Sequence, residues 1–136
     1  MPARLRIELQ AVPEKVPSAR GAITRLCEHL ELEDELTGQI RLAVTEACTN
    51  CVLHAYDGEP GPVPAPTFAL EARVDGDALV VVVRDAGGGI PAVRSARAGL
   101  GLGMRLIEKA ASSVDITSRP GRGTRVAMRF ALHPAR

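Results

Sequence analysis

The sequence predicts an α+β fold in which helices pack on one face of a mostly antiparallel sheet. Two helical segments follow a single strand near the N-terminus, and the later strands come in pairs separated by the turn signals "DGD" and "PGRG". The expected order is strand, helix, helix, strand, strand, helix, strand, strand, at residues 3–10, 18–30, 33–55, 67–74, 78–86, 103–111, 113–119 and 124–132.

The first three elements follow from hydrophobic spacing. Residues 3–10 alternate apolar and polar side chains, which is typical of a strand with one face inward. From Ser18, a candidate N-cap, apolar residues recur at helical spacing as far as Leu30. The next helix has an apolar face made of Leu36, Ile40, Ala43, Val44 and Ala47. Residues 57–66 hold four prolines and cannot continue it, so we read them as a short mobile connector.

The remaining elements form two hairpins and one helix. The Asp-Gly turn joins 67–74 to 78–86, and the second of these runs is apolar enough to be a central strand. Residues 103–111 have helical spacing, and "PGRG" joins the last two strands. No linker divides the 136 residues, so residues 1–136 are expected to form a single domain.

Composition and charge exclude several classes of protein. No apolar run approaches the roughly 20 residues that span a bilayer, and the N-terminus lacks the apolar core of a signal peptide, so we expect a cytoplasmic protein without membrane contact. The net charge is only +1, and the aromatic residues are few (Tyr56, Phe68 and Phe130). Direct nucleic-acid binding is therefore not expected.

The three cysteines, Cys27, Cys48 and Cys51, are expected to be buried structural thiols. The Cys48-x-x-Cys51 spacing alone also suits redox chemistry or a metal site. The pair lies within a predicted helix, however, and no second pair completes four metal ligands.

Three polar side chains, which we call the polar ladder, run along one face of the second predicted helix. Glu46, Asn50 and His54 are four residues apart and therefore share one face of a largely apolar helix. A solvated helix face and a binding site are both consistent with this spacing.

Three glycine clusters punctuate the second half of the chain. Asp85 ends an apolar strand and is followed by Gly87, Gly88 and Gly89, a pattern that suits a turn or the close approach of a flat ligand. Before the third helix come Gly99, Gly101 and Gly103, whose backbone N–H groups and helix dipole suit phosphate. The last cluster, Gly121, Gly123 and Thr124, is by itself a hairpin turn.

Two common nucleotide motifs are absent. The chain contains no G-x-x-x-x-G-K-[ST]. A dinucleotide fingerprint would need its third glycine at Met104 and a parallel βαβ unit, which the element order does not supply.

Taken together, "TEACTNCVLHAY", "RDAGGGI", "GLGLGMRLI" and "GRGTRV" resemble the ordered motifs of the GHKL ATPase superfamily, and most closely the small bacterial anti-sigma factor serine/threonine kinases. The resemblance implies the Bergerat fold, a two-layer α/β sandwich with a mostly antiparallel mixed sheet, and the cofactors ATP and Mg²⁺.

The same resemblance implies a role for each motif. Glu46 would be the general base, and Asn50 would bind Mg²⁺. Asp85 would accept a hydrogen bond from the adenine amino group, which guanine lacks at that position. The remaining nucleotide-binding residues would be Gly87, Gly89, Gly99, Gly101, Gly103 and Thr124. His54 would be structural or lie behind the residues that touch the nucleotide.

One departure concerns the ATP lid. Only residues 91–98, "PAVRSARA", separate Ile90 from Gly99, and the lid is usually longer in the family. The short lid leaves two functions open: a kinase, or a nucleotide-binding module that regulates a partner by binding alone. A histidine kinase is disfavoured, because neither His29 nor His133 lies on a dimerising helical hairpin.

The resemblance also implies partners. These are a sigma factor and an anti-anti-sigma protein of the STAS fold, whose phosphorylation on Ser or Thr would release it and let the sigma factor be captured. Homodimers are common in the family, so a second copy of the chain is a further expected partner.

Overall fold

A computed structural model describes residues 4–55, 66–85, 101–119 and 123–132. The predicted connector 57–66, apart from Pro66, and the lid 91–98 lie outside the described residues, as does His133. The order of helices and strands is the predicted one, with a short additional 3-10 helix, η1, at Pro13–Lys15.

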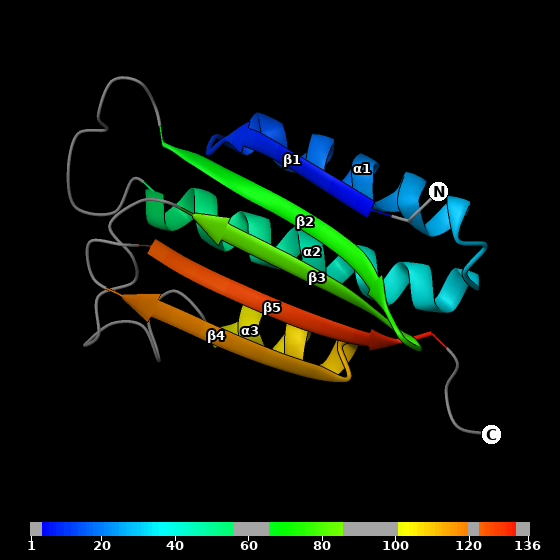
Figure 1. Ribbon diagram of the computed structural model, residues 1–136. Coiled ribbons are helices and arrows are strands. Elements are labelled where there is room, and N and C mark those ends of the chain that lie inside the picture. The colour runs from blue at the N-terminus through cyan, green and yellow to red at the C-terminus, as the bar shows by residue number, and fades with distance from the viewer. Residues whose placement is uncertain (1–3, 56–65, 86–100, 120–122, 133–136) are drawn as a thin grey trace.

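Five strands form one sheet in the order β1-β2-β3-β5-β4 (Figure 1). Their bounds are β1 Arg4–Gln10, β2 Thr67–Asp75, β3 Ala78–Asp85, β4 Ser113–Arg119 and β5 Gly123–Ala131. Each neighbouring pair is antiparallel, so the described sheet is antiparallel throughout. The apolar strand β3 is central, as predicted.

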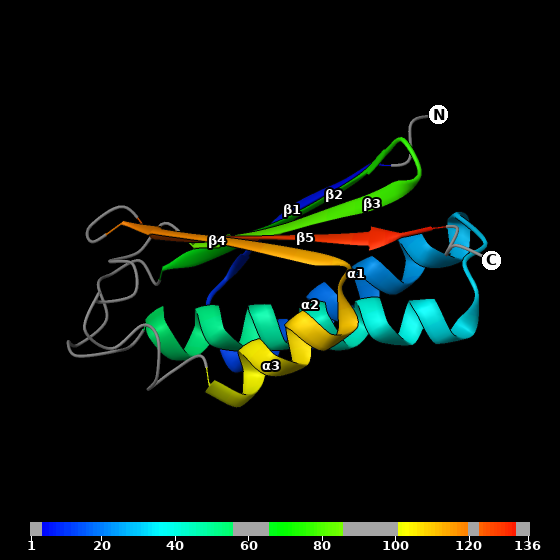
Figure 2. The ribbon, with the colours of Figure 1, turned by 90° about the horizontal axis from the view of Figure 1, so that it is seen from below.

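Three helices cover one face of this sheet (Figure 2). They are α1 Val16–His29, α2 Asp34–Ala55 and α3 Gly101–Ala110. The prediction of Ser18 as an N-cap is wrong, because α1 begins two residues earlier, with Lys15 at the N-cap position and no side-chain cap. Pro17 allows this start, since the first turn of a helix does not need its N–H groups.

The core lies between the helices and the inward side chains of the sheet. On β3 and β5 every second side chain points toward the helices, as Val83 and Val126 do, and is buried. Phe68 pairs with Asp85 at the end of β3, so the period of two places Asp85 on the same inward face. The strand register therefore puts a carboxylate where the pattern of β3 would otherwise place a core residue.

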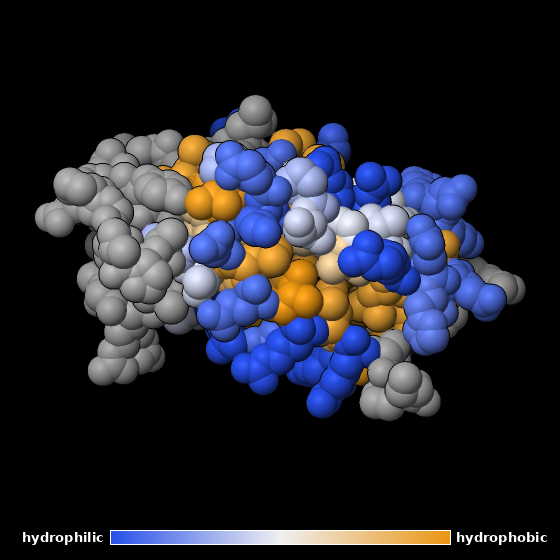
Figure 3. Space-filling model, turned by 90° about the horizontal axis from the view of Figure 1, so that it is seen from above, coloured by the Kyte–Doolittle hydropathy of each residue, from blue (hydrophilic) through white to orange (hydrophobic). Residues whose placement is uncertain are grey.

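Strand β1 forms one edge of the sheet and is only partly covered. Its inward residues Leu5, Ile7 and Leu9 are half-buried against the core. The view from above shows hydrophobic surface along this side of the molecule, bordered by hydrophilic residues (Figure 3).

The junction between α1 and α2 contains a residue in an unusual conformation. The N–H of Glu31 donates to the carbonyl oxygen of Glu28 at 3.0 Å, and that of Leu32 donates to Cys27 at 3.1 Å. This is the Schellman arrangement, in which the residue after the helix cap adopts a left-handed conformation that favours glycine. Glu31 occupies that position with φ of 55° and is the one described non-glycine residue with positive φ.

Candidate functional site

Four elements place those predicted site residues that the structure describes toward one end of the molecule. We call it the Asp85 end, where α2 and β3 finish and α3 and β5 begin (Figure 1). The opposite end, which we call the Gly76 end, holds the turn between β2 and β3. Motifs that are far apart in the sequence therefore meet at a single edge of the two-layer fold.

The polar ladder on α2 lies between the core and the solvent rather than on the fully exposed face. Asn50 is buried, with 9% of its surface exposed, and Glu46 one turn earlier is half-buried. Leu53, by contrast, is 60% exposed. A buried amide three residues before an exposed leucine reverses the usual preference of these side chains, and such reversals are the informative exceptions to burial rules.

The Asn50 side chain has no hydrogen-bond partner among the described residues. By contrast, Thr45 and Thr49 on the same helix both donate to the carbonyl four residues earlier, at 2.7 Å. A buried amide without a partner costs about 1–3 kcal/mol. A ligand that bonds to the Asn50 amide would remove this cost.

Asp85 and Thr124 are brought together by the sheet. Arg84 pairs with Arg125 in the β3–β5 ladder, so the next positions, Asp85 and Thr124, adjoin on the inward face. Thr124 is 6% exposed and, with Asn50, completes the buried polar residues of the described chain. Helix α2 also lies near this pair, because the charge of the Asp85 carboxylate helps to raise the pKa of Cys51 on α2.

Gly123 lies beside Asp85 but is not among the site residues that the sequence predicts. Its φ is 100°, and a Cβ at this position would lie 2.0 Å from the backbone oxygen of Asp85 and 3.1 Å from its side-chain Oδ1. Only glycine permits this approach, so Gly123 fixes the path of the chain beside the carboxylate. The glycine is visible in the sequence "GRGT", but its contact with Asp85 depends on the register of the strands, which the sequence does not show.

The cysteines are buried thiols, as predicted. All three are free and buried. Burial raises the pKa of Cys48 to about 12, and burial together with the nearby Asp85 carboxylate raises the pKa of Cys51 well above its ordinary value. Neither thiol therefore has the thiolate character that redox or metal chemistry needs at neutral pH.

The glycine clusters are described only in part. Gly101 and Gly103 lie in the first turn of α3, which begins at the Asp85 end. This agrees with a phosphate site at a helix N-terminus. Gly87, Gly89 and Gly99 lie outside the described residues, and of His54 only the backbone is described, as part of α2.

The side-chain oxygen of Asn50 has the chemistry of a Mg²⁺ ligand. Among the described residues no cluster of three or more His, Cys, Asp or Glu side chains is placed to hold a metal. Mg²⁺ typically binds through one or two protein oxygens together with water and substrate phosphates. The unbonded Asn50 amide, with Glu46 one turn away, offers such an oxygen.

Comparison with known proteins agrees with this arrangement. A family model described as a histidine kinase-like ATPase domain matches residues 9–130, which include the α2 ladder, Asp85 and Thr124. The chain belongs to this ATPase domain family. The resemblance to the GHKL superfamily is thereby confirmed, and membership in an ATPase domain family implies nucleotide binding.

Curated relatives of this ATPase domain match it over almost their whole length. The anti-sigma F factor of Oceanobacillus iheyensis is 31% identical over 139 residues, covering 94% of this chain and 92% of the relative. That of Clostridium perfringens strain SM101 is 27% identical over 143 residues, covering 98% and 99%.

Solved structures share the ATPase domain fold within longer chains. The RsbU and RsbW domains of Rv1364c from Mycobacterium tuberculosis match with a TM-score of 0.72 at 22% identity, covering 98% of this chain and 34% of that one. The blue-light activated histidine kinase of Erythrobacter litoralis EL346 matches with a TM-score of 0.64 at 25% identity, covering 82% and 40%. The chain thus spans well under half of each.

Within the described residues, no helix combines the length and the apolar character needed to cross a bilayer.

Proposed function

We propose that this chain is a Mg²⁺-ATP-dependent serine/threonine protein kinase and anti-sigma factor, formed by a single domain of residues 1–136 and acting in the cytoplasm. The observation that carries the proposal is Asn50, a buried amide with no described hydrogen bond, one turn from Glu46 and at the end of the fold where Asp85 and Thr124 adjoin. The anti-sigma F factors that match the chain over nearly their full length support the regulatory part.

Adenine would bind at the carboxylate end of β3. Asp85 would accept a hydrogen bond from the exocyclic amino group, and Thr124 on the adjoining strand would support the same edge, through water. Gly87 and Gly89 would allow the ring to lie close to the backbone. Gly123 supports this role because it leaves no side chain between β5 and Asp85.

The phosphates would bind between α2 and the start of α3. The glycines Gly99, Gly101 and Gly103 would supply backbone N–H groups, and the positive end of the α3 dipole would favour the negative charge. Asn50 would offer its side-chain oxygen to Mg²⁺. The ion would supply charge neutralisation across the phosphates when bound.

Glu46 would act as the general base. The hydroxyl oxygen of a Ser or Thr on the partner attacks the γ-phosphorus, the bond to the β–γ bridging oxygen breaks, and ADP leaves with that electron pair. The hydroxyl proton passes to the Glu46 carboxylate. The half-buried position of Glu46 on α2 supports this role, since it adjoins both solvent, from which a protein substrate arrives, and buried Asn50.

Phosphorylation would set which partner is held. The proposed substrate is an anti-anti-sigma protein of the STAS fold, which leaves after it is phosphorylated. The sigma factor is then captured and held inactive, so the ATP to ADP ratio and the phosphorylation state of the partner control transcription.

Phosphate transfer tests the proposal directly. The purified protein is incubated with γ-labelled ATP, Mg²⁺ and the STAS-domain proteins of the same organism, and phosphoserine and phosphothreonine are measured. We expect transfer that Glu46→Gln lowers by about 100-fold or more while ATP binding remains. Glu108→Gln, which changes an exposed carboxylate of α3, is the matched control and should leave transfer unchanged. Absence of Mg²⁺-dependent transfer to every STAS partner, with ATP bound, would refute the kinase.

A second function, regulation by nucleotide-dependent binding alone, is favoured by the short segment 91–98 between two glycine clusters. Glu46→Ala separates the two functions. A pure binding module would still regulate its partner after this substitution, whereas a kinase would retain the unphosphorylated STAS protein and fail to switch.

A further inference from the structure

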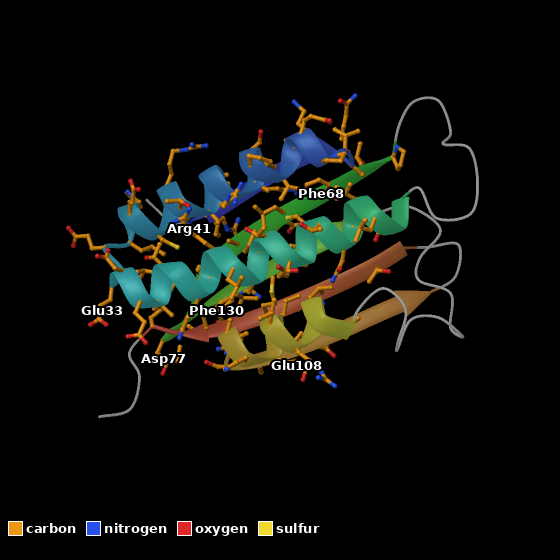
Figure 4. The ribbon with its side chains drawn as sticks, turned by 180° about the vertical axis from the view of Figure 1, so that it is seen from behind. Glu33, Arg41, Phe68, Asp77, Glu108 and Phe130 are labelled. Atoms are coloured by element: carbon orange, nitrogen blue, oxygen red, sulfur yellow. The ribbon has the colours of Figure 1, made fainter. Side chains whose placement is uncertain are left out.

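A groove lies at the Gly76 end, away from the proposed nucleotide site. Its volume is about 650 Å³, and it lies between the α1–α2 junction, the β2–β3 turn and the ends of α3 and β5. Glu33 and Asp77 project at this end, and Phe130 lies between the helices and the sheet (Figure 4). None of the residues given a role in nucleotide binding or phosphate transfer lines this groove.

The floor of the groove is apolar. It is formed by Leu30, Leu32, Leu36, Val74, Phe130 and Leu132. Most of these side chains are half-buried, and Val74 is 38% exposed, which makes it one of three exposed large hydrophobic residues of the described chain. Apolar surface gathered in a concave site, rather than scattered singly, is typical of a binding groove.

The rim of the groove is acidic. Glu31, Glu33 and Glu35 line it, all three are exposed, and none makes an ion pair with a described residue. No described Lys or Arg lines the groove. Asp75, at the end of β2, differs from these three because its carboxylate forms an ion pair with Arg129 at 3.2 Å. Among the described residues, therefore, no cation neutralises the three glutamates around the apolar floor.

One of these carboxylates is held at a conformational cost. Glu31 has φ of 55° at a position where glycine is the favoured residue, and the left-handed conformation is unfavourable for residues with a Cβ. Strained residues of this kind concentrate at functional sites. Compared with glycine, glutamate at position 31 therefore lowers local stability and places a carboxylate at the rim of the groove.

From this charge and shape we infer that the groove binds a basic amphipathic segment of a partner protein, with apolar side chains on the floor and Lys or Arg side chains opposite the three glutamates. A protein segment can present several cations around an apolar side chain, one for each rim carboxylate. A small ligand with a single charge cannot pair with all three glutamates. The expected mode is a helix laid in a groove, with anchors at i, i+3, i+4 and i+7. This goes beyond the proposed kinase, because it assigns a second surface that works with or without nucleotide.

The test uses the full chain and a fluorescein-labelled peptide of about 18 residues, with Leu at the anchor positions and Lys elsewhere. The comparison peptide has Glu in place of each Lys. Binding is measured by fluorescence anisotropy, and its location by the amide shifts of the isotope-labelled protein. We expect the Lys peptide to bind, the Glu peptide not to bind, and the shifts to cluster on residues 30–39 and 74–76 and the end of β5.

Two sets of variants separate specific docking from general attraction. Glu31→Gln/Glu33→Gln/Glu35→Gln should weaken binding by about tenfold or more. Glu14→Gln/Glu108→Gln/Asp115→Asn removes the same charge at exposed positions elsewhere and should change it by less than about twofold. Gln39→Trp, at an exposed lining position, should block the groove, whereas Gln39→Ala should not.

Several results would overturn the inference. These are no binding of the Lys peptide, an equal loss in both triple variants, or amide shifts outside the groove. Groove shifts that appear with increasing protein concentration and no peptide would identify a second copy as the occupant, and would equally reject a basic partner segment. Calorimetric titration of each variant with ATP measures the nucleotide site separately. Failure of the proposed nucleotide site can therefore be distinguished from failure of the groove to bind the peptide.

Discussion

Gly123 approaches Asp85 so closely that a Cβ on it would lie 2.0 Å from the Asp85 backbone oxygen. The contact joins the start of β5 to the end of β3 at the proposed adenine edge. Gly123→Ala adds both a backbone clash and strain at φ of 100°, and we expect it to lower the free energy of unfolding by about 2–4 kcal/mol. Urea denaturation measures this change, and ATP titration should show weakened binding as well.

Two other glycines serve as matched controls. A Cβ at Gly76 meets nothing within 4 Å, but its φ is 62°, so Gly76→Ala should cost about 1 kcal/mol from conformation alone. Gly38 lies inside α2 with open space around it, and Gly38→Ala should stabilise the protein by roughly 0.5–1 kcal/mol. An equal cost at all three positions would show that the approach to Asp85 does not matter.

Selectivity for adenine should depend on the Asp85 carboxylate. Asp85→Asn keeps the shape of the side chain but replaces the carboxylate by a neutral amide. The amide oxygen accepts a weaker hydrogen bond from adenine, and the amide nitrogen can donate one to the guanine oxygen. We expect ATP affinity to fall by about 10- to 100-fold, as for the loss of a hydrogen bond to a charged group, and the ratio of ATP to GTP affinity to narrow. Competition binding with both nucleotides measures the ratio. A ratio that does not change would remove Asp85 from base recognition.

The strain at Glu31 should be relieved by glycine. Glu31→Gly removes the Cβ that opposes the left-handed conformation and keeps both Schellman hydrogen bonds, so the protein should gain roughly 0.5–1 kcal/mol of stability. Thermal unfolding measures the gain. Glu33→Gly, two residues later and without positive φ, is the control and should give no gain. Equal effects at both positions would contradict the assignment of strain.

The buried thiols should make stability fall at alkaline pH. The folded pKa of Cys48, about 12, lies above the unfolded value of 9.0, so above pH 9 the unfolded chain binds fewer protons than the folded one. Stability from this thiol is complete below pH 9 and is lost as the pH rises toward 12, with a slope approaching about 1.4 kcal/mol per pH unit. Cys48→Ala should flatten the decline of unfolding free energy between pH 9 and 11.

Val44→Ala is the control for that experiment, because it truncates an equally buried side chain of α2 that does not titrate. Both variants should lose stability at pH 7, but only Cys48→Ala should change the alkaline slope. Parallel slopes in the two variants would show that the Cys48 thiol does not titrate differently on folding.

Local pattern predicted most of the fold and the part of the site that depends on single segments. The alternation in β1, the Asp-Gly turn before β3 and the i, i+4 spacing of Glu46 and Asn50 are visible in the chain itself. The start of α1 was misplaced because Ser18 is a good N-cap residue by type, while Pro17 allows a helix to begin before it.

Features that depend on register or on several segments could not be predicted. The need for glycine at 123 arises from its contact with Asp85, 38 positions away in the sequence. The floor of the groove at the Gly76 end combines residues from separate helices and strands, so no local pattern in the sequence predicts it. No local pattern distinguishes Glu31, Glu33 and Glu35 from other exposed charged residues, and only the fold places them around one groove.

The central claim is that the Asp85 end binds ATP with Mg²⁺, and calorimetric titration tests it most directly. The protein is titrated with ATP with and without Mg²⁺, and with GTP plus Mg²⁺. We expect Mg²⁺-dependent binding of ATP, weak or no binding of GTP, and loss of the Mg²⁺ dependence in Asn50→Ala. Absence of ATP binding in the presence of Mg²⁺, by a protein that is shown to be folded, would contradict the claim.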